Sequence, residues 1–338
     1  MKTVLMLTCA YNYSGGGHLT RTLAIAEHFL KKNYLIKYYI LSNLKRKTIK
    51  KFKINFKYKI FLNLLKFYNF IIKNNIKNKY IIFDFSNEKI IKNKKILKKI
   101  LNFLKENKSK LTIIDSTQND SIENKIKPLY CSQLINPYFI KKTKKIFNYK
   151  KLIGIKYFVG NNKLKPKSEI KKNDIVITFG MSDAYKQTYH LLKIFLNDPQ
   201  FIKKNKINVL YTELFNKNYT KKLLAMKNKN INFIKNPNSK KLSYLFNSSK
   251  LALIGTGNIK YELLPFNIKK IIFSPSRKSD SQSKFFLKNF QKIGFIKSRT
   301  SNKEILEYVK KYINDKTIVK NENPYANSIN NIYKAIIS

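Results

Sequence analysis

Short apolar runs alternate along the chain with longer segments in which apolar residues recur at helical spacing. The runs are rich in Val, Ile and Tyr and have the length of buried strands. The predicted strands cover residues 3–8, 34–41, 80–85, 111–115, 175–179, 207–211, 231–234, 251–254 and 268–273. Strands that alternate with helices in this way favour parallel sheets with crossover helices, an α/β fold.

The predicted helices cover residues 18–32, 88–105, 184–196, 281–293 and 303–313. Residues 141–172 are dense in lysine and lack a strong periodic signal, and a series of strands lies on either side of them. We therefore expect an N-terminal domain over residues 1–160 and a C-terminal domain over residues 161–320. Residues 321–338 are expected to form a helix that crosses back to the first domain.

Composition limits the class of protein. The 338 residues are 43% hydrophobic, which allows two compact domains and excludes intrinsic disorder. Cys9 and Cys131 cannot build a disulfide framework, which fits a reducing cytoplasm. The apolar start of the chain is best interpreted as a buried strand. Ile60–Ile72 is too short and too polar to span a bilayer, and predicts a basic amphipathic helix that packs inward or lies on a membrane surface.

The charge balance is strongly positive: 70 Lys and Arg against 18 Asp and Glu give a net charge of +52. Such a chain attracts polyanions, including nucleic acid and anionic lipid. Nearly all of the charge is lysine, however, and a nucleic-acid surface usually relies on arginine. A coding bias towards Lys, Ile and Asn explains the charge equally simply. We expect no specific nucleic acid partner and leave peripheral contact with an anionic membrane open.

A glycine-rich turn follows the first predicted strand and opens the first helix. It contains Gly15, Gly16, Gly17, His18 and Arg21. Glycines allow a ligand to approach the backbone, and the amides of a helix N-terminus favour an anion. The same helix end favours a neutral histidine ring, which suits His18 to act as a general base. A flexible turn with a capping histidine remains the alternative.

The second half of the chain has two comparable turns. The first, Gly180–Met181–Ser182–Asp183, predicts a phosphate site in which Asp183 caps the helix, or simply an ordinary helix cap. The second, Gly255–Thr256–Gly257–Asn258, precedes Glu262, which could accept hydrogen bonds from ribose hydroxyls or could be a solvated charge. Gln282, in Asp280–Ser281–Gln282 after another predicted strand, is a further candidate contact with sugar hydroxyls, with a helix cap as the alternative.

The chain lacks the DxD, HExxH and histidine–carboxylate spacings of metal sites, and it lacks the GxSxG elbow of serine hydrolases. We expect neither a metal nor a cofactor, so helix ends and a few cations would stabilise a leaving diphosphate.

The turns in this order resemble the GT-B fold, two Rossmann-like domains facing across a cleft. The chain is similar to the UDP-sugar hydrolase of the pseudaminic acid pathway and the related spore-coat polysaccharide glycosyltransferase-like proteins, and more distantly to the peptidoglycan N-acetylglucosaminyltransferase. The G-x-G-H-x-x-R turn of that family matches Gly15, Gly17, His18 and Arg21, and its I-I-D strand end matches Asp84.

The resemblance implies further roles. It makes His18 the catalytic base, Gly180–Asp183 and Gly255–Asn258 the nucleotide turns, and Glu262 and Gln282 nucleotide contacts. A G-x-x-Y motif near the domain junction matches Gly154 and Tyr157, which makes Tyr157 a further candidate binding residue. Met181 replaces a glycine, and Phe85 and Ser86 replace an aromatic residue and a histidine in the hydrolases. The implied activity is metal-independent hydrolysis of a UDP-sugar in surface-glycan biosynthesis. The alternatives are transfer of the sugar to a glycan or lipid acceptor and, in another class, a basic nucleic-acid-binding protein.

Overall fold

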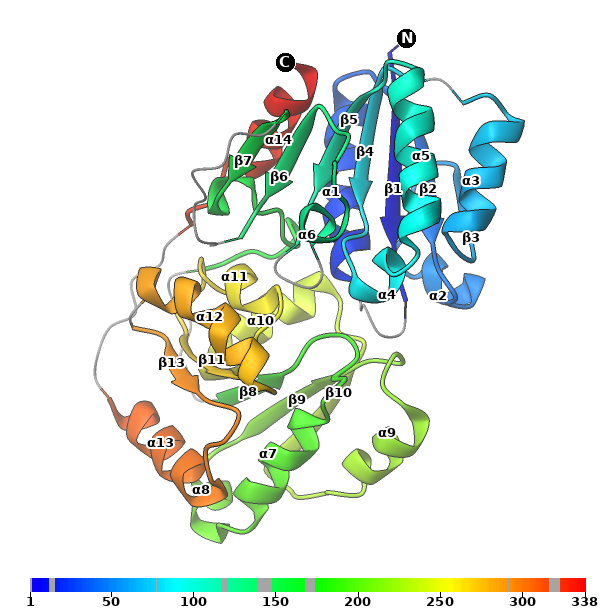
Figure 1. The fold of residues 1–338 in the computed structure, drawn as a ribbon. Helices are drawn as coiled ribbons and strands as arrows, with labels where there is room; N and C mark the ends of the chain where they lie inside the picture. The colour runs from blue at the N-terminus through cyan, green and yellow to red at the C-terminus, as the bar shows by residue number, and fades with distance from the viewer. Residues whose placement is uncertain are drawn as a thin grey trace. The chain divides into compact units, whose positions relative to one another are not determined.

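The computed structural model describes residues 2–11, 16–76, 78–116, 121–138, 148–167, 174–290, 292–315 and 323–338. The chain forms two compact units. The N-terminal domain contains Met1–Gly160 together with Pro324–Ser338, and the C-terminal domain contains Asn161–Asn323. Figure 1 shows a sheet flanked by helices in each unit.

The N-terminal domain is built on a 7-stranded parallel sheet with the order β3-β2-β1-β4-β5-β6-β7. Its strands are β1 (Thr3–Cys9), β2 (Leu35–Leu41), β3 (Tyr58–Phe61), β4 (Tyr80–Asp84), β5 (Lys110–Ile114), β6 (Gln133–Asn136) and β7 (Lys150–Ile153). Its helices are α1 (Gly17–Lys31), α2 (Arg46–Lys50), α3 (Leu64–Lys73), α4 (Glu88–Ile91), α5 (Lys94–Glu106), α6 (Ile122–Lys125), the 3-10 turn η2 (Ile155–Tyr157) and α14 (Ser328–Ile337).

Strand β1 explains why this sheet is covered on both faces. Its side chains alternate between two buried clusters, with Leu5 and Leu7 in one and Val4 and Met6 in the other. The first cluster includes side chains of α3 and α5, and the second includes side chains of α1 and α14 (Figure 1). Residues far apart in sequence thus complete one core.

The C-terminal domain is built on a 6-stranded parallel sheet with the order β10-β9-β8-β11-β12-β13. Its strands are β8 (Asp174–Thr178), β9 (Ile207–Tyr211), β10 (Ile231–Lys235), β11 (Ser249–Gly255), β12 (Lys269–Phe273) and β13 (Gly294–Ile296). Its helices are α7 (Gln187–Leu196), α8 (Pro199–Lys204), α9 (Lys217–Leu224), α10 (Ser239–Ser248), α11 (Ile259–Glu262), α12 (Arg277–Asn289) and α13 (Asn302–Asn314).

Both strand orders contain a point at which the direction of winding reverses. In the N-terminal sheet it lies between β1 and β4, and in the C-terminal sheet between β8 and β11. Parallel α/β sheets bind ligands outside the carboxyl ends of the strands at such a switch point. We therefore expect ligand-binding residues in the segments that follow β1, β4, β8 and β11.

The expected fold class, α/β with two Rossmann-like domains, is confirmed. Several predicted helix bounds were wrong. The helix expected over residues 281–293 begins at Arg277, and the helix expected over residues 88–105 divides into α4 and α5. The expected helix over Ile60–Ile72 divides into the end of β3 and α3, because Asn63 caps a helix that begins at Leu64. Helix α7 begins at Gln187 rather than at Ala184, because Asp183 and Lys186 have positive φ angles that interrupt a helix. Within the described residues, no helix is long and apolar enough to cross a membrane.

Helix α14 docks on α1 through a histidine. The ring of His28 meets Tyr333 edge-on with centroids 5.2 Å apart, and its Nε2 is buried and has no hydrogen-bond partner in the structure. Burial, followed by the charges of Lys32 and Lys31, lowers the pKa of His28 below 6.5.

We predict that this contact makes stability sensitive to mild acid. A histidine whose pKa is lower in the folded protein leaves stability unaffected above about pH 6.5 and costs stability as the pH falls, because the unfolded chain takes up the proton first. The free energy of unfolding should therefore decrease more between pH 7.5 and 5.5 in the wild type than in His28→Gln, as measured by urea denaturation. Equal decreases would contradict the assignment.

Candidate functional site

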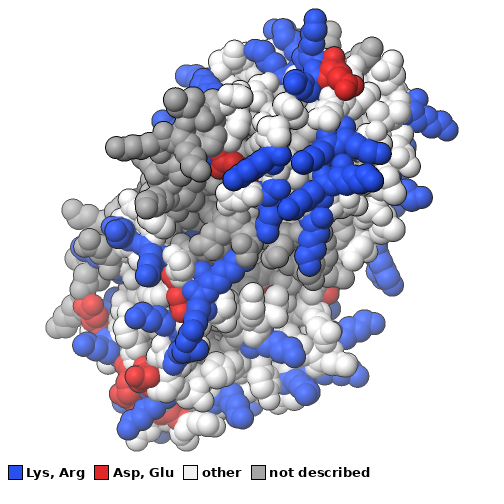
Figure 2. All heavy atoms as spheres, viewed as in Figure 1, with Lys and Arg blue, Asp and Glu red and all other residues white. Residues whose placement is uncertain are grey.

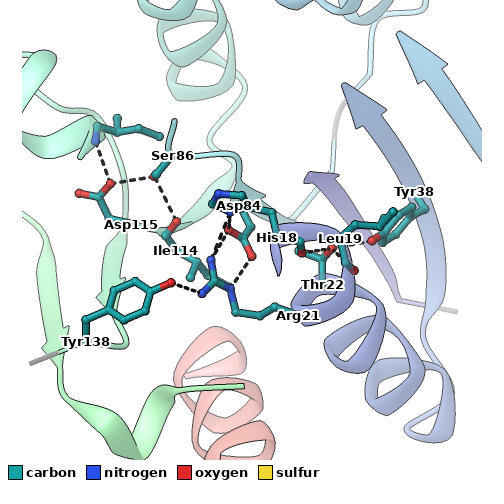
Figure 3. Close-up of polar contacts among 11 residues, drawn as sticks. His18, Leu19, Arg21, Thr22, Tyr38, Asp84, Ser86, Ile114, Asp115 and Tyr138 are labelled. Carbon is teal, nitrogen blue, oxygen red and sulfur yellow. Dashed lines mark hydrogen bonds and ion pairs between the residues drawn. The ribbon is translucent and has the colours of Figure 1, made fainter. Parts of the chain in front are cut away.

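The N-terminal candidate site centres on a histidine–aspartate pair at the switch point. His18 is the second residue of α1, which follows β1, and Asp84 is the last residue of β4. His18 Nδ1 lies 2.6 Å from Asp84 Oδ1 (Figure 3). Because β1 and β4 are neighbours in the sheet, their carboxyl ends bring these two residues together across 66 positions of sequence.

Arg21 fixes the carboxylate of this pair. It lies one turn after His18 on α1, so both side chains reach the same place. Arg21 Nε and Nη2 each donate to a different oxygen of Asp84 at 2.7 Å, and Nη1 donates to the hydroxyl of Tyr138 at 2.9 Å. The Arg21 side chain is only 1% exposed. A fork-shaped guanidinium bound at two points leaves the carboxylate little freedom to rotate.

The charges of this cluster determine which nitrogen of His18 carries the proton. Burial alone would raise the pKa of Asp84, but the positive charge of Arg21 and then the contact with His18 outweigh it and hold the pKa below its ordinary value. An ionised carboxylate only accepts hydrogen bonds, so the proton is assigned to His18 Nδ1. Nε2 is then left with its lone pair, and within the described residues it makes no hydrogen bond. The His18 side chain is 13% exposed.

The glycine turn before His18 is described only in part. Gly15 lies outside the described residues, Gly16 is buried and precedes α1, and Gly17 is the first residue of that helix. The N-cap residue Gly16 carries no side chain, and among the described residues no side chain caps the N-terminus of α1. Uncapped amides at a helix start can bind an anion or a sugar oxygen.

A second buried carboxylate lies beyond the neighbouring strand β5. Asp115 accepts a hydrogen bond from the hydroxyl of Ser86 at 2.8 Å (Figure 3). It also accepts from the hydroxyl of Ser121 at 2.6 Å and from the amide of Ile122 at 2.7 Å. Burial raises its pKa although these hydrogen bonds oppose the shift. Asp115 holds the start of α6 in place. Phe85 and Ser86 stand where the UDP-sugar hydrolases carry an aromatic residue and a histidine. In this structure Phe85 is a buried core residue. Ser86 donates a hydrogen bond to Asp115.

In the C-terminal domain, the turn after β8 runs from Gly180 to Lys186. Gly180 has φ of 85°, a conformation that favours glycine. Asp183 is buried and its carboxylate accepts from the amides of Gln187 at 2.9 Å and Thr188 at 3.0 Å, and from the Tyr219 hydroxyl at 2.5 Å. These first amides of α7 are therefore occupied. The backbone of Gly180, Met181 and Ser182 is left as the part of this turn that can receive a phosphate.

The turn after β11 lies against the turn after β8. Gly255 lies beside Phe179, which follows β8: a Cβ atom on Gly255 would be in ordinary van der Waals contact with the Phe179 ring at 3.4 Å and with the Gln187 side chain at 3.9 Å. Gly257 is exposed, and Thr256 and Asn258 are half-buried. The structure thus brings together two turns that are far apart in the sequence.

Glu262 ends the short helix α11 that follows the second turn. Its Oε1 accepts from the backbone amide of Asn161 at 3.0 Å, and burial raises its pKa although that hydrogen bond opposes the shift. The carboxylate is thus held in a defined position beside the turn. A carboxylate in this position can accept hydrogen bonds from ribose hydroxyls.

The remaining predicted residues lie elsewhere. Gln282 belongs to α12, and its side chain is outside the described part of the chain. Tyr157 is in η2, 8% exposed, and packs in the core cluster that α1 and α14 share.

The sequence interpretation did not predict the contacts of Tyr138 with Arg21 and of Tyr219 with Asp183. Asp84 was noticed only as part of the resemblance, although a carboxylate at a predicted strand end is a signal in itself.

We predict that Arg21 and Asp84 stabilise the domain as a pair. Arg21→Met leaves a buried carboxylate without its cation and should cost about 3–5 kcal/mol of unfolding free energy. The double variant Arg21→Met/Asp84→Leu should be more stable than Arg21→Met, because no buried charge then lacks a partner. Urea denaturation of both variants and of Asp84→Leu completes the cycle. Wild-type stability in Arg21→Met would contradict the pairing.

The sequence matches no protein-family model and no curated protein. The fold, in contrast, matches solved structures over the whole chain. MurG from Acinetobacter baumannii gives a TM-score of 0.66 at 10% identity, covering 100% of this chain and 99% of that one. UDP-GlcNAc 2-epimerase from Methanocaldococcus jannaschii, in complex with UDP-GlcNAc and UDP, gives 0.66 at 13% identity, covering 100% and 99%. The spinosyn rhamnosyltransferase SpnG, complexed with thymidine diphosphate, gives 0.61 at 6% identity, covering 100% and 96%. These likenesses establish the GT-B fold, whereas the similarity to the pseudaminic acid hydrolase and spore-coat proteins stays a prediction.

Proposed function

We propose that the protein is a glycosyltransferase that moves a sugar from a nucleoside diphosphate, UDP in our expectation, to a hydroxyl acceptor. The observation that carries the proposal is the His18–Asp84 pair at the switch point of the first sheet, in which Nδ1 of His18 faces the carboxylate and Nε2 makes no hydrogen bond within the described residues. The neighbouring folds support the nucleotide sugar: an epimerase bound to UDP-GlcNAc and a rhamnosyltransferase bound to thymidine diphosphate.

In the proposed reaction, His18 Nε2 accepts the proton of the acceptor hydroxyl as its oxygen attacks C1 of the sugar. The bond between C1 and the diphosphate oxygen breaks, the nucleoside diphosphate leaves with the bonding electrons, and C1 is inverted. Asp84 accepts the Nδ1 hydrogen bond and stabilises the imidazolium that forms, as a buried carboxylate does for other catalytic histidines. A positioned general base contributes about 10²- to 10⁴-fold to the rate.

The nucleotide is assigned to the C-terminal domain. Backbone amides of the turns at Gly180–Ser182 and Gly255–Asn258 would receive the diphosphate, and Glu262 would accept hydrogen bonds from the ribose. Amides that are already fixed by the fold stabilise negative charge on the leaving group without reorganising. Arg21 is not assigned to the phosphate, because its guanidinium nitrogens are engaged by Asp84 and Tyr138. It acts instead by positioning the carboxylate that orients His18.

Hydrolysis of the same nucleotide sugar is the second candidate. The resemblance of Gly17, His18, Arg21 and Asp84 to the pattern of the UDP-sugar hydrolases favours it. The same base would then deprotonate water, and the product would be the free sugar. The two reactions differ in the nucleophile, so product analysis separates them.

We predict that release of UDP from UDP-GlcNAc accelerates when alcohol acceptors, from free sugars to lipid-linked sugars, are added. Mass spectrometry should find the sugar joined to the acceptor. Steady release of UDP and free sugar at a rate that no acceptor changes would favour hydrolysis. His18→Ala should reduce the rate at least about 10²-fold because the base is lost, while UDP binding measured by calorimetry stays the same. A wild-type rate in His18→Ala would refute the role of the base.

The nucleotide assignment is tested separately. Glu262→Ala should weaken UDP binding about tenfold, the loss expected when hydrogen bonds to a charged acceptor are removed. Glu307→Ala is the matched control, since Glu307 is an exposed residue of α13 whose side chain contacts only Lys310 through an ion pair in the described structure. Calorimetry with UDP alone measures the UDP affinity of both variants. If both variants bound UDP like the wild type, Glu262 would not be part of the nucleotide site.

A further inference from the structure

Helix α3 carries apolar side chains that the fold leaves exposed. Its inner face, with Leu64, Phe67 and Ile71, is buried against the sheet. Leu65 and Ile72, two turns apart on another side of the helix, are 45% and 43% exposed, and Leu62, just before the helix, is 60% exposed. We call Leu62, Leu65 and Ile72 the α3 stripe. Burial in the core does not explain why these positions are apolar.

Lysines border the α3 stripe. Lys66 and Lys73 of α3 are exposed, and Lys59 of β3 lies with its Nζ 3.9 Å from the ring centroid of Phe70. Lys99, from the adjacent α5, lies 6.0 Å from the ring centroid of Tyr68, which is partly buried in α3.

Helix α5 extends the basic surface. Its exposed lysines are Lys94, Lys95, Lys98, Lys99 and Lys105. The sequence of α3 contains no Asp or Glu, and that of α5 contains only its last residue, Glu106. Figure 2 shows blue side chains crowded over the N-terminal domain, including the region that α5 occupies in Figure 1, with few red ones among them. An acidic partner would meet little repulsion here.

The combination of exposed apolar side chains and lysines favours an anionic lipid surface over other anionic partners. Positive charge alone suits any polyanion, including nucleic acid. Leucine and isoleucine gain nothing from a phosphate backbone, but they gain free energy when they enter the boundary between lipid headgroups and acyl chains. Lysines beside them reach the headgroups while their methylene stems lie along apolar surface.

We propose that the face formed by the α3 stripe and the lysines of α3 and α5 docks on the surface of an anionic lipid bilayer. The stripe enters the acyl boundary, and the lysines bind the headgroups. Each lysine close to an anionic surface strengthens binding roughly fivefold. The lysines therefore attract the protein to the headgroups, and the apolar stripe inserts below them. Such attachment is peripheral and reversible. It does not depend on the proposed reaction, and a membrane-bound enzyme would meet lipid-linked acceptors at short range.

Vesicle flotation of the full chain tests the proposal. The wild type should float with vesicles of phosphatidylcholine mixed with phosphatidylglycerol and should not float with phosphatidylcholine alone. The variant Leu62→Gln/Leu65→Gln/Ile72→Gln should bind the anionic vesicles at least about tenfold more weakly. The matched control Leu30→Gln/Leu35→Gln changes leucines of α1 and β2 that are 38% and 46% exposed, and it should bind like the wild type.

Retention of duplex DNA separates insertion from simple charge attraction. The stripe variant keeps every lysine, so its DNA retention and its circular dichroism should equal those of the wild type. Lys98→Gln/Lys99→Gln should weaken vesicle binding more than Lys221→Gln/Lys222→Gln in α9 of the other domain. The proposal is overturned if the stripe variant binds vesicles like the wild type, or if it loses vesicle and DNA binding to the same extent.

Discussion

The buried ion pair between Arg21 and Asp84 is the interaction on which the candidate site depends. A carboxylate removed from water would take up a proton unless a cation compensated its charge, and Arg21 does so through two hydrogen bonds. An ionised Asp84 in turn requires the proton on Nδ1 of His18 and so directs the lone pair of Nε2 away from the cluster. Arg21, whose side chain is 1% exposed, thereby fixes the carboxylate that orients the ring of His18.

The topology of the sheets explains why these groups meet. In each domain the chain leaves a central strand, winds to one edge, and returns to start again on the other side of that strand. The strand ends on either side of the reversal therefore face a gap that no crossover helix fills. In the N-terminal domain this position holds a charged cluster, and in the C-terminal domain it holds two backbone turns, in one of which Asp183 caps α7. The two domains share one architecture and offer different chemistry.

The central strands were predictable because they are buried on both faces and form continuous apolar runs, as in β1, β4 and β11. The strands β3, β6, β7 and β13 were missed because each has only three or four residues and because β3 and β7 contain lysine, so the local pattern gives no strong signal. His18 stood out through its glycines. The partnership of His18 with Asp84 and Arg21 could not be predicted from spacing, because it depends on which strands are neighbours. Likewise, nothing in the residues around Asp183 reveals that its carboxylate occupies the first amides of α7.

The return of α14 to the first domain has a consequence for how the protein is made. Ile332 and Ile336 belong to the same buried cluster as Val4 and Met6, so the first domain encloses its core with residues from both ends of the chain. A ribosome delivers residues in order, and all of the C-terminal domain emerges before α14 does. The core of the N-terminal domain can therefore be completed only after the C-terminal domain has been synthesised, and until then the α1 side chains that α14 covers stay exposed.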